Sequence, residues 1–537
     1  MSLKRIPTPA QDAGNWGTIL NNHLAQTQNP LNGAFNSFDQ FSDRPTNLTA
    51  EDAGKTYLYT QTGNWHEWSG SEWKVQNKSE INVKDYGAVG DGVANDTVAI
   101  QFCLNNFKSI YFPAGVFGCN TMNIPSNKSL KGDGSTLSEI RNINKFENHF
   151  LYSENEVNIT IDSLYLNGNK NNRLPNGASA SGGSTYQFGN AEITKEPRKN
   201  NILIKNCTIS GNGFNNIGSI NSHHVLLDGC NFINGRDSGI AATIGCSNWT
   251  VVNSDFDSTM LFPISFSNNG VGPSFPSIPN VYDLVDQARN VIISNNKILV
   301  GSSLGINGDA SPGFGIEIDA CRNVVIANNI ITITQKGFYG IRIFPSYEKP
   351  NNYDCNHINV IGNTIINQSS LAPVGIELYN NTSDVTPKYI KLSNNIIINE
   401  ITSGFVGISA YNMNKAIIEN NVIGSLLGKT MSTGILLDAG NATNVDILEN
   451  DISGCSFVGI QCGDTTNTIS QKVSLTNNKV YGNGTNLGLG IGWEFTTKQL
   501  RPCTQLFDSK SYPWGYALLF SASSRWYLES ERTSLCG

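Results

Sequence analysis

The chain has 537 residues, a net charge of −7 and only 15% charged residues, with 52 glycines. One compact core does not grow to this length, so several domains or a repeat array are expected. The sequence has no dense cluster of Lys and Arg. It therefore argues against a nucleic-acid partner, which needs cations to displace phosphate counterions.

The cysteines and histidines give no sign of a metal site. The eleven cysteines are scattered without a CxxC pair, and the six histidines do not cluster beyond His223-His224. We therefore expect no cofactor, and buried thiols made in a reducing compartment rather than a disulfide framework. No stretch reaches the roughly 20 apolar residues of a membrane span. No run at the N-terminus has the form of a signal peptide, so neither membrane insertion nor export is predicted.

The first predicted element in chain order is a short N-terminal segment. Residues 5–21 read RIPTPAQDAGNWGTILN, with Pro7-Thr8-Pro9, Asp12, Trp16-Gly17 and Leu20-Asn21. This segment resembles the N-terminus of phage tail fibres and tailspikes, which attaches the fibre to the particle. The resemblance implies that residues 1–35 bind a phage tail or baseplate protein, and that the chain belongs to a virion made in the host cytoplasm.

Residues 36–80 are predicted to form a small β-rich module. Residues 56–76 read as short strands, with turns at Thr62-Gly63-Asn64 and Ser69-Gly70-Ser71. The aromatic side chains of this segment suit either the core of a small β module, which we favour, or a sugar-stacking surface. They are Tyr57, Tyr59, Trp65, Trp68 and Trp73.

The segment 85–117 marks the start of the main domain. DYGAVGDGVANDTVAIQ is followed by IYFPAGVF, and Asn95 or Asp96 can cap a helix on which Ile100, Cys103, Leu104 and Phe107 share one face. This order of elements resembles the opening of the pectate-lyase-like superfamily of right-handed parallel β-helices. The resemblance implies that the helix plugs one end of the coil and hides strand edges that would otherwise pair with other chains. In that family the motif is structural and contributes no catalytic residue.

From about residue 200 a short strand pattern containing Asn or Gly recurs every 25–35 residues or so, as in VIISNNKIL (291–299) and VSLTNNKVY (473–481). Such a period indicates a β-solenoid, whereas an antiparallel sandwich does not predict one anchor per coil. Asn tolerates left-handed backbone angles, and its amides can stack, so these residues are interpreted as structural. The anchors are Asn206, Gly229, Ser254, Asn295, Asn328, Asn363, Asn394, Asn420, Asn450 and Asn477. Residues 81–486 are thus predicted to be an all-β, right-handed parallel β-helix.

A second strand in each coil opens with Gly-Ile, as at Gly315-Ile316 and Gly375-Ile376. If each Ile faces the core, alternation places two columns of side chains outside. The first column is Ala241, Ser265, Glu317, Arg342, Glu377, Ser409, Leu436 and Gln461. The second is Thr243, Ser267, Asp319, Phe344, Tyr379, Tyr411, Asp438 and Gly463. Insertions at 268–290, 300–313, 345–357 and 380–388 are expected to wall this face.

Carboxyl groups, a cation and aromatic rings on one face suit the cleavage of a polysaccharide. Glycoside hydrolysis needs two carboxyl groups, and both Glu317 with Asp319 and Glu317 with Glu377 fit the wider, inverting separation better than the retaining one. A carboxylate beside Arg342 should stay ionised, and one beside Phe344 should become protonated. We therefore expect Asp319 as general acid, Glu317 as base and Glu377 as the alternate base.

The remaining residues of this face are expected to hold the substrate. Arg342 can bind substrate charge, and aromatic rings stack on sugars, so Phe344, Tyr379 and Tyr411 are assigned to binding. Asp237 is a further candidate that also suits a turn aspartate. The competing interpretation is an external salt-bridge ladder of Glu317, Arg342 and Glu377 without catalysis.

Several functions remain open at this point. The resemblance to phage tailspikes implies a homotrimer that binds a bacterial surface polysaccharide, whether capsule, exopolysaccharide or O-antigen. Hydrolysis is favoured; lyase chemistry on a uronate, a non-catalytic receptor-binding spike and a secreted pectinase-like enzyme are the alternatives. Residues 487–537 leave the repeat and are rich in aromatic residues, which fits capping, trimer contact or sugar binding.

Overall fold

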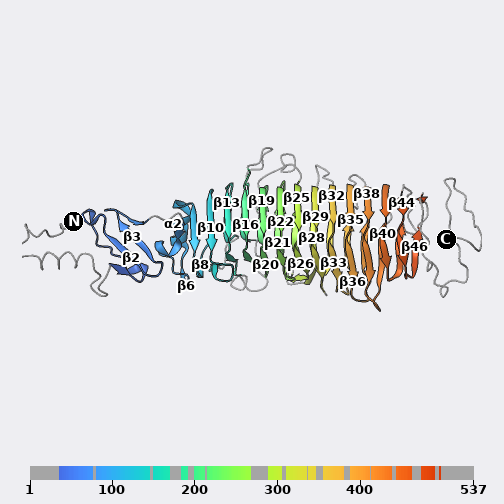
Figure 1. Ribbon diagram of the computed structural model, residues 1–537, viewed down its shortest axis with the longest axis horizontal. Helices are drawn as coiled ribbons and strands as arrows, with labels where there is room; N and C mark the ends of the chain where they lie inside the picture. The colour runs from blue at the N-terminus through green and yellow to red at the C-terminus, as the bar shows by residue number, and fades with distance from the viewer. Residues whose placement is uncertain are drawn as a thin grey trace, which may run out of the picture.

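The computed structural model forms an elongated rod with a small sheet at its N-terminal end (Figure 1). It describes residues 36–76, 80–144, 149–169, 183–190, 199–211, 215–267, 288–304, 310–334, 337–345, 355–379, 387–411, 413–437, 443–462, 473–489 and 495–497. The predicted attachment segment 1–35 and most of 487–537 lie outside these residues.

The small N-terminal module is built from one four-stranded sheet. Its strands are β1 (Ser37–Phe38), β2 (Thr56–Tyr59), β3 (Asn64–Trp68) and β4 (Trp73–Val75), with 3-10 turns η1 (Phe41–Asp43) and η2 (Ala50–Asp52). Tyr59 is buried and stacks on Phe38, and Trp68 packs edge-on against Trp73. These aromatic residues therefore pack against one another within the module, the alternative that the sequence favours.

Three long parallel sheets form the rest of the rod. Sheet 1 contains β5 (Ile81–Asn82), β7 (Ser109–Phe112), β10 (Lys128–Gly132), β13 (Ile159–Asp162), β16 (Ile202–Lys205), β19 (His223–Asp228), β22 (Ser247–Val252), β25 (Arg289–Ser294), β29 (Arg322–Ala327), β32 (Asn356–Ile361), β35 (Lys388–Ser393), β38 (Asn414–Glu419), β41 (Thr443–Leu448), β44 (Val473–Thr476) and β47 (Phe495–Thr497).

Sheet 2 follows sheet 1 in each coil. It contains β6 (Asp91–Asn95), β8 (Gly115–Cys119), β11 (Ser138–Asn142), β14 (Tyr165–Asn167), β17 (Thr208–Ser210), β20 (Asn231–Ile233), β23 (Asp255–Phe256), β26 (Lys297–Val300), β30 (Ile330–Ile333), β33 (Thr364–Asn367), β36 (Ile396–Asn399), β39 (Val422–Ser425), β42 (Asp451–Ser453) and β45 (Lys479–Tyr481).

Sheet 3 completes the coil and carries the predicted Gly-Ile strands. It contains β9 (Met122–Asn123), β12 (Leu151–Glu154), β15 (Ser184–Gly189), β18 (Asn215–Ile220), β21 (Ser238–Thr243), β24 (Phe262–Ser267), β28 (Ala310–Asp319), β31 (Gly337–Phe344), β34 (Val374–Leu378), β37 (Val406–Ala410), β40 (Met431–Leu437), β43 (Cys455–Cys462) and β46 (Thr485–Leu489), with β27 (Ser302–Leu304) antiparallel to β28. The chain is thus the all-β parallel β-helix that the sequence predicts.

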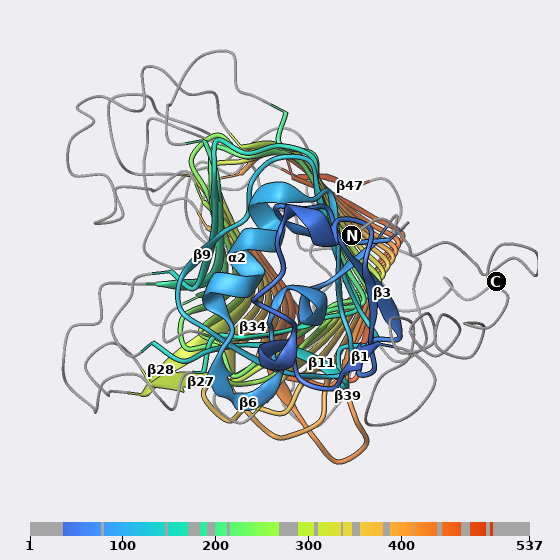
Figure 2. The same cartoon turned by 90° about the vertical axis from the view of Figure 1, so that its left-hand side faces the viewer.

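The predicted capping helix is α2 (Thr97–Asn106), which lies across the N-terminal end of the coil (Figure 2). Ile100, Cys103 and Leu104 on its inner face are buried, as predicted. Asp96 occupies the N-cap position, but its side chain does not cap the helix. Instead, its carboxylate accepts hydrogen bonds from the backbone N–H groups of Val89 and Gly90, at 2.7 and 3.1 Å. It therefore fixes the Gly-rich turn that leads into β6.

In the repeated Asn pair, one residue has the left-handed backbone and the next residue forms the stack of side-chain amides. The first residue has the left-handed backbone, as in Asn394 with φ 56°. The second is buried and stacks, so that the Asn395 amide donates to the Oδ1 of Asn421 at 3.0 Å. The predicted anchors Ser254, Asn363 and Asn450 are wrong by one residue, because Asn253, Gly362 and Glu449 hold the left-handed corner in those coils.

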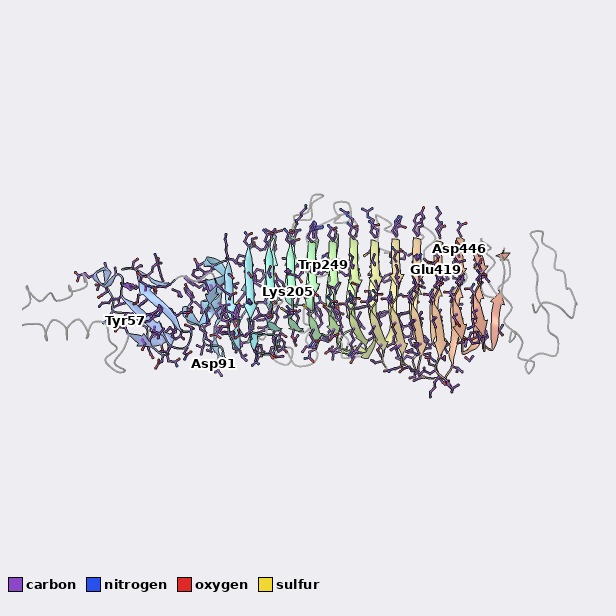
Figure 3. The ribbon with its side chains drawn as sticks, in the orientation of Figure 1. Tyr57, Asp91, Lys205, Trp249, Glu419 and Asp446 are labelled. Carbon is purple, nitrogen blue, oxygen red and sulfur yellow. The ribbon has the colours of Figure 1, made fainter. Side chains whose placement is uncertain are left out.

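The core of the coil is a stack of apolar side chains that point inward from all three sheets. The inward Ile of each Gly-Ile strand, such as Ile316, Ile341 and Ile376, is fully buried. Trp249 of β22 lies within the coil, whereas Lys205, Glu419 and Asp446 lie on sheet 1 with their side chains outward (Figure 3). Each buried aliphatic side chain contributes about 1.5–3 kcal/mol, so every coil adds its own share of stability.

The described residues contain neither a disulfide nor a membrane-spanning helix. The nine cysteines among them are all buried free thiols, as expected. No helix in this part of the chain is long and apolar enough to span a bilayer.

Candidate active site

The two predicted outer columns of sheet 3 are aligned as expected. Glu317 of β28 pairs in register with Ser265 on one side and with Arg342 on the other. Arg342 in turn pairs with Glu377 of β34, and Asp319 pairs with Phe344. Adjacent coils lie about 4.8 Å apart, so these side chains form one continuous patch. Asp438 and Gly463, at the far end of the second column, lie outside the described residues.

Arg342 is ion-paired on one side of its column. Its Nε donates a hydrogen bond to the Oε2 of Glu377 at 2.8 Å. Glu317 instead accepts a hydrogen bond from the Oγ of Ser265 at 2.9 Å. The continuous salt-bridge ladder Glu317–Arg342–Glu377, which was the non-catalytic interpretation, is therefore not formed.

The protonation of Glu317 differs from the sequence-based expectation. Burial raises the pKa of Glu317 to about 7, and the nearby Asp237 carboxylate adds to this rise. The Ser265 hydrogen bond and the charge of Arg342 oppose it without overcoming the loss of hydration. The expectation that Arg342 keeps Glu317 ionised is therefore wrong, and Glu317 can carry a proton near neutral pH.

Glu377 has a different environment on the other side of Arg342. Burial raises the pKa of Glu377, whereas the charge and hydrogen bond of Arg342 and a hydrogen bond from Tyr339 lower it. Burial raises the pKa of Tyr339 to about 12, so its phenol stays protonated and can donate. Glu377 thus has an ion pair that Glu317 lacks.

Asp319 is almost completely buried, with 1% of its surface exposed. Its Oδ2 accepts a hydrogen bond from the Oγ of Ser267 at 2.9 Å. Its register partner Phe344 is also buried, and the ring of Phe344 lies 4.6 Å from the guanidinium carbon of Arg342. Asp319 therefore lies beside an aromatic ring, as expected, but it is less accessible than Glu317.

Asp237 lies close enough to Glu317 for its charge to influence that residue. It immediately precedes β21, and its Oδ2 accepts a hydrogen bond from the Oγ of Ser238 at 3.1 Å. Burial raises the pKa of Asp237 to about 6. Asp237 is therefore more than a solvated turn aspartate: it is a second desolvated carboxyl group of this patch.

Aromatic rings surround the Arg342 guanidinium, and some of them were missed in the sequence. Phe262, Phe314 and Tyr339 stack in successive coils, with ring centroids 5.0 and 5.1 Å apart. Tyr379 and Tyr411 form the predicted stack on the other side, at 5.8 Å. The distances from the guanidinium carbon of Arg342 to ring centroids are 5.1 Å for Tyr339, 5.5 Å for Phe314 and 5.7 Å for Tyr379.

The position of the three missed aromatic residues in the sequence could have revealed them. Phe314 and Tyr339 directly precede the Gly of the Gly-Ile pairs, and Phe262 precedes the equivalent Pro263. The sequence-based alignment started at the Gly and so excluded the position before it. The Gly side of the strand points inward, because a Cβ at Gly375 would meet Phe405 and Ile397 of the core.

The expected groove walls are only partly described. Of the four insertions, 268–287, 305–309, 346–354 and 380–386 lie outside the described residues. Among the residues that are described, no group of three or more His, Cys, Asp or Glu is placed to hold a metal ion.

Comparison with known proteins agrees with the fold. Residues 80–272 match the family described as rhamnogalacturonase A/epimerase, pectate lyase-like. This range includes Asp237 but ends before Glu317, Arg342 and Glu377.

Two groups of relatives share parts of the chain. The preneck appendage protein of Bacillus phage PZA is 25% identical over 261 residues, which are 44% of this chain and 29% of that protein. The mannuronan C5-epimerase AlgE2 of Azotobacter vinelandii is 32% identical over 114 residues, 17% of this chain and 11% of that protein. The chain therefore spans less than a third of the length of either relative.

Among the solved structures that are similar to this chain is the enzymatically active domain of tailspike protein 2 from bacteriophage CBA120. It is 14% identical, with 76% of this chain and 55% of that chain covered and a TM-score of 0.48. The strand register shows a parallel β-helix along the coiled part of the chain, and residues 80–272 of it match a pectate-lyase-like family model.

Proposed function

We propose that this protein is a phage tailspike or appendage that binds and cleaves a bacterial surface polysaccharide by glycosidic hydrolysis. The match to phage preneck appendage proteins and the tail-fibre-like N-terminal segment support the virion location. The β-helix presents a face with carboxyl groups and aromatic rings, which suits a long polymer lying across several coils. Residues 1–35 are the proposed attachment segment, and a homotrimer is the proposed assembly.

The observation that carries hydrolysis is the difference in environment between two carboxyl groups on one face, although burial raises the pKa of both. Glu317 has a pKa of about 7 because it is buried, whereas Glu377 is paired with Arg342. Two carboxyl groups with different environments are the usual basis of an acid and a base in one site. Glu317 is therefore the general acid, which donates its proton to the leaving glycosidic oxygen, and Glu377 is the base that activates water.

The spacing of the pair is nearer to that of inverting than to that of retaining hydrolases. Glu317 and Glu377 are two coils apart, so their backbones are separated by about 9.6 Å. Inverting hydrolases hold their carboxyl groups roughly 6.5–9.5 Å apart to leave room for the water. These roles differ from the sequence-based ones, in which Asp319 was the acid; Asp319 remains the alternative base.

The aromatic rings on either side of the charged column are the proposed sugar-binding residues. Sugar rings stack on aromatic faces, and the two stacks run parallel to the column. Arg342 orients Glu377 and contacts the substrate with its remaining N–H groups. The binding residues are Phe262, Phe314, Tyr339, Tyr379 and Tyr411, together with Arg342, whereas the buried Phe344 packs against Arg342.

A second candidate is chemistry at C5 of a uronic acid, by a lyase or an epimerase. The sequence match to mannuronan C5-epimerases favours it. That reaction needs a cation to neutralise the uronate carboxylate while a base removes the C5 proton. Arg342 is the central cation of the patch, and its N–H groups other than Nε can contact a uronate. We favour hydrolysis because the face carries the two carboxyl groups that an acid and a base require.

The test is an assay of both products on a panel of capsules, exopolysaccharides and O-antigens. New reducing ends without unsaturated uronides are expected. Glu317→Gln and Glu377→Gln should each reduce cleavage by about 10²–10⁴-fold, the usual contribution of a general acid or base. Cleavage by the unchanged protein should fall as the pH rises above about 7, because Glu317 loses its proton.

Asp446→Asn is the matched control, since it removes an outward carboxylate of sheet 1 (Figure 3). It should leave cleavage unchanged. Unsaturated uronides among the products would establish the lyase instead. Binding without either product would leave a receptor-binding spike if the polymer is unchanged, or an epimerase if the configuration at C5 of its uronic acids has changed. Full activity of Glu317→Gln together with loss of activity in Asp319→Asn would restore the sequence-based assignment of the acid.

A further inference from the structure

A second column of left-handed residues runs along the corner where each coil passes from sheet 3 into sheet 1. Strand pairing aligns these residues one above another in eleven successive coils. Each has a φ between 50° and 62°. In chain order they are Asn127, Asn158, Asn201, His224, Asn248, Asn290, Asn323, His357, Tyr389, Lys415 and Asn444.

Asn is the residue that suits this column. It adopts left-handed angles far more readily than other side chains that carry a Cβ. Its amide can also bond to the Asn of the coil below: Asn201 donates to Asn158 at 2.9 Å, and Asn323 donates to Asn290 at 3.1 Å. The column is therefore a structural ladder wherever Asn occupies it.

Four coils depart from the rule: His224 alone, and the three consecutive coils of His357, Tyr389 and Lys415. The φ angles of these three are 55°, 57° and 56°, a conformation that His adopts more readily than Tyr or Lys does. Residues held in such conformations cost on the order of 1 kcal/mol or more each, and they cluster at functional sites. The chain tolerates this strain in three adjacent coils, although Asn would relieve it.

These three side chains form an exposed, ordered cluster. The rings of His357 and Tyr389 are stacked, with centroids 4.8 Å apart and planes 15° from parallel. The Nζ of Lys415 donates a hydrogen bond to the Tyr389 hydroxyl at 3.1 Å. Tyr389 nevertheless keeps 47% of its surface exposed. The cluster thus presents an aromatic ring that is held in place by its neighbours.

The surroundings of Tyr389 are positively charged. The hydrogen bond from Lys415 and the charges of Lys415 and Lys388 lower the pKa of Tyr389. Lys391, two residues along the same strand, is neutralised by Glu419 at 2.6 Å. Among the described residues, Lys388 and Lys415 therefore give the cluster a local positive charge on a chain whose net charge is −7.

The cluster lies next to the candidate active site. Tyr411 of the second outer column is four residues before Lys415 along the chain, and Tyr379 is ten residues before Tyr389. Tyr379 and Tyr411 stack on each other at the end of sheet 3, and His357, Tyr389 and Lys415 open the next strands of sheet 1. The cluster and the aromatic end of the candidate active site therefore flank the same corner of the coil.

We propose that His357, Tyr389 and Lys415 form an accessory subsite for an acidic sugar residue of the bound polysaccharide, separate from the cleavage point. The inference rests on the proposed function of the neighbouring face. Tyr389 supplies the stacking surface, and Lys415 and Lys388 attract the carboxylate, sulfate or phosphate group of the sugar.

The test uses affinity electrophoresis of the full chain, with Glu317→Gln present so that the polymers stay intact. The gels contain polygalacturonate, alginate or hyaluronate, with neutral dextran for comparison. We expect at least one acidic polymer to retard the protein more strongly than dextran does. Tyr389→Asn should weaken that binding about tenfold, which corresponds to about 1.4 kcal/mol. Lys415→Asn should weaken it as well.

The matched control is His224→Asn, the same replacement in the same column several coils away. It should leave binding unchanged. All three Asn variants should melt at or above the temperature of the parent, because Asn suits the left-handed backbone. Retention of full binding by Tyr389→Asn, or equal retardation by dextran and the acidic polymers, would overturn the subsite. If the subsite is overturned, cleavage by a Tyr389→Asn chain that keeps Glu317 would show that the proposed function is still correct.

Discussion

At the scale of single residues, burial decides the chemistry of Glu317. Sequence alignment placed Arg342 beside it and so predicted an ionised carboxylate. In the folded chain the loss of hydration outweighs that charge, and Arg342 pairs with Glu377 instead. Which of two carboxyl groups receives a hydrogen bond from an arginine depends on side-chain rotation, and strand register alone does not determine it.

Because burial raises the pKa of Glu317, the free energy of unfolding should depend on pH. Folded Glu317 holds its proton more tightly than the unfolded chain, with a pKa of about 7 against an ordinary value of 4.5. The folded state therefore loses stability as the pH rises from 4.5 through 7. Glu317→Gln keeps the side chain neutral, so it should increase the free energy of unfolding by about 1–3 kcal/mol at pH 8.

The measurement is denaturant unfolding of both proteins at pH 8 and at pH 4.5. The difference should shrink at pH 4.5, where Glu317 is protonated in the folded state and about half protonated in the unfolded state. A variant that is less stable than the parent at pH 8 would show that the folded chain stabilises the Glu317 carboxylate, and so that burial does not raise its pKa. Asp446→Asn serves as the control, because the stability difference between it and the parent should not follow this pH dependence.

At the scale of the element, the two residues of an Asn pair differ in their surroundings: one is buried in the coil and the other forms the corner of the turn. Asn395 is fully buried and donates to the carbonyl of Val360 at 2.9 Å and to Asn421 at 3.0 Å. Its Oδ1 accepts from the backbone and side-chain amides of Asn363. Asn394, one residue earlier, contributes the left-handed backbone of the corner.

The two residues should therefore respond differently to substitution. Asn395→Ala leaves buried donors and an acceptor without partners, so it should lower the free energy of unfolding by about 2–4 kcal/mol. Asn394→Gly should change it by less than about 1 kcal/mol, because Gly adopts the same angle. Guanidinium unfolding of the two variants measures the difference. Equal effects would mean that the stacked amides do not stabilise the coil beyond the turn itself.

The sequence predicted the strands of each coil well, but it did not predict which residue of each corner pair has the left-handed backbone. Period, strand alternation and the Gly-Ile pairs were enough to align Glu317, Arg342 and Glu377 in register. They did not distinguish the corner residue from the stacked one, because both are Asn in half of the ten coils. Where one of the two differs, as at Gly362-Asn363, the anchor was placed one residue off.

At the scale of the whole molecule, one buried carboxylate joins the N-terminal module to the coil. Asp85 lies in η3 (Val83–Tyr86) at the start of the β-helix and is 1% exposed. It accepts hydrogen bonds from Thr62, at 2.6 Å, and from the side-chain amide of Asn64, and it lies 3.4 Å from the Nε2 of His66. All three partners belong to the module.

Asp85→Asn should loosen the module while leaving the coil intact. Loss of hydrogen bonds to a charged group costs on the order of 2 kcal/mol, which corresponds to roughly thirtyfold faster opening. Hydrogen exchange should therefore increase in β2 and β3 but not in the central strands of sheet 1. Glu80→Gln, a carboxyl change at the same junction, is the control. Unchanged exchange in β2 and β3 would show that Asp85 does not hold the two parts together.

The sequence by itself determined the coil, because its period, its alternation and its capping helix are local patterns that repeat along the chain. Register then followed, since every coil buries the same Ile position. Only the tertiary structure decided which carboxyl group is protonated, which one pairs with Arg342, and how the aromatic rings surround that residue. It also showed the strained corner at His357, Tyr389 and Lys415. Hydration, charge and side-chain contacts depend on which coils lie next to each other and on how much water each side chain loses, and these quantities exist only in the folded chain.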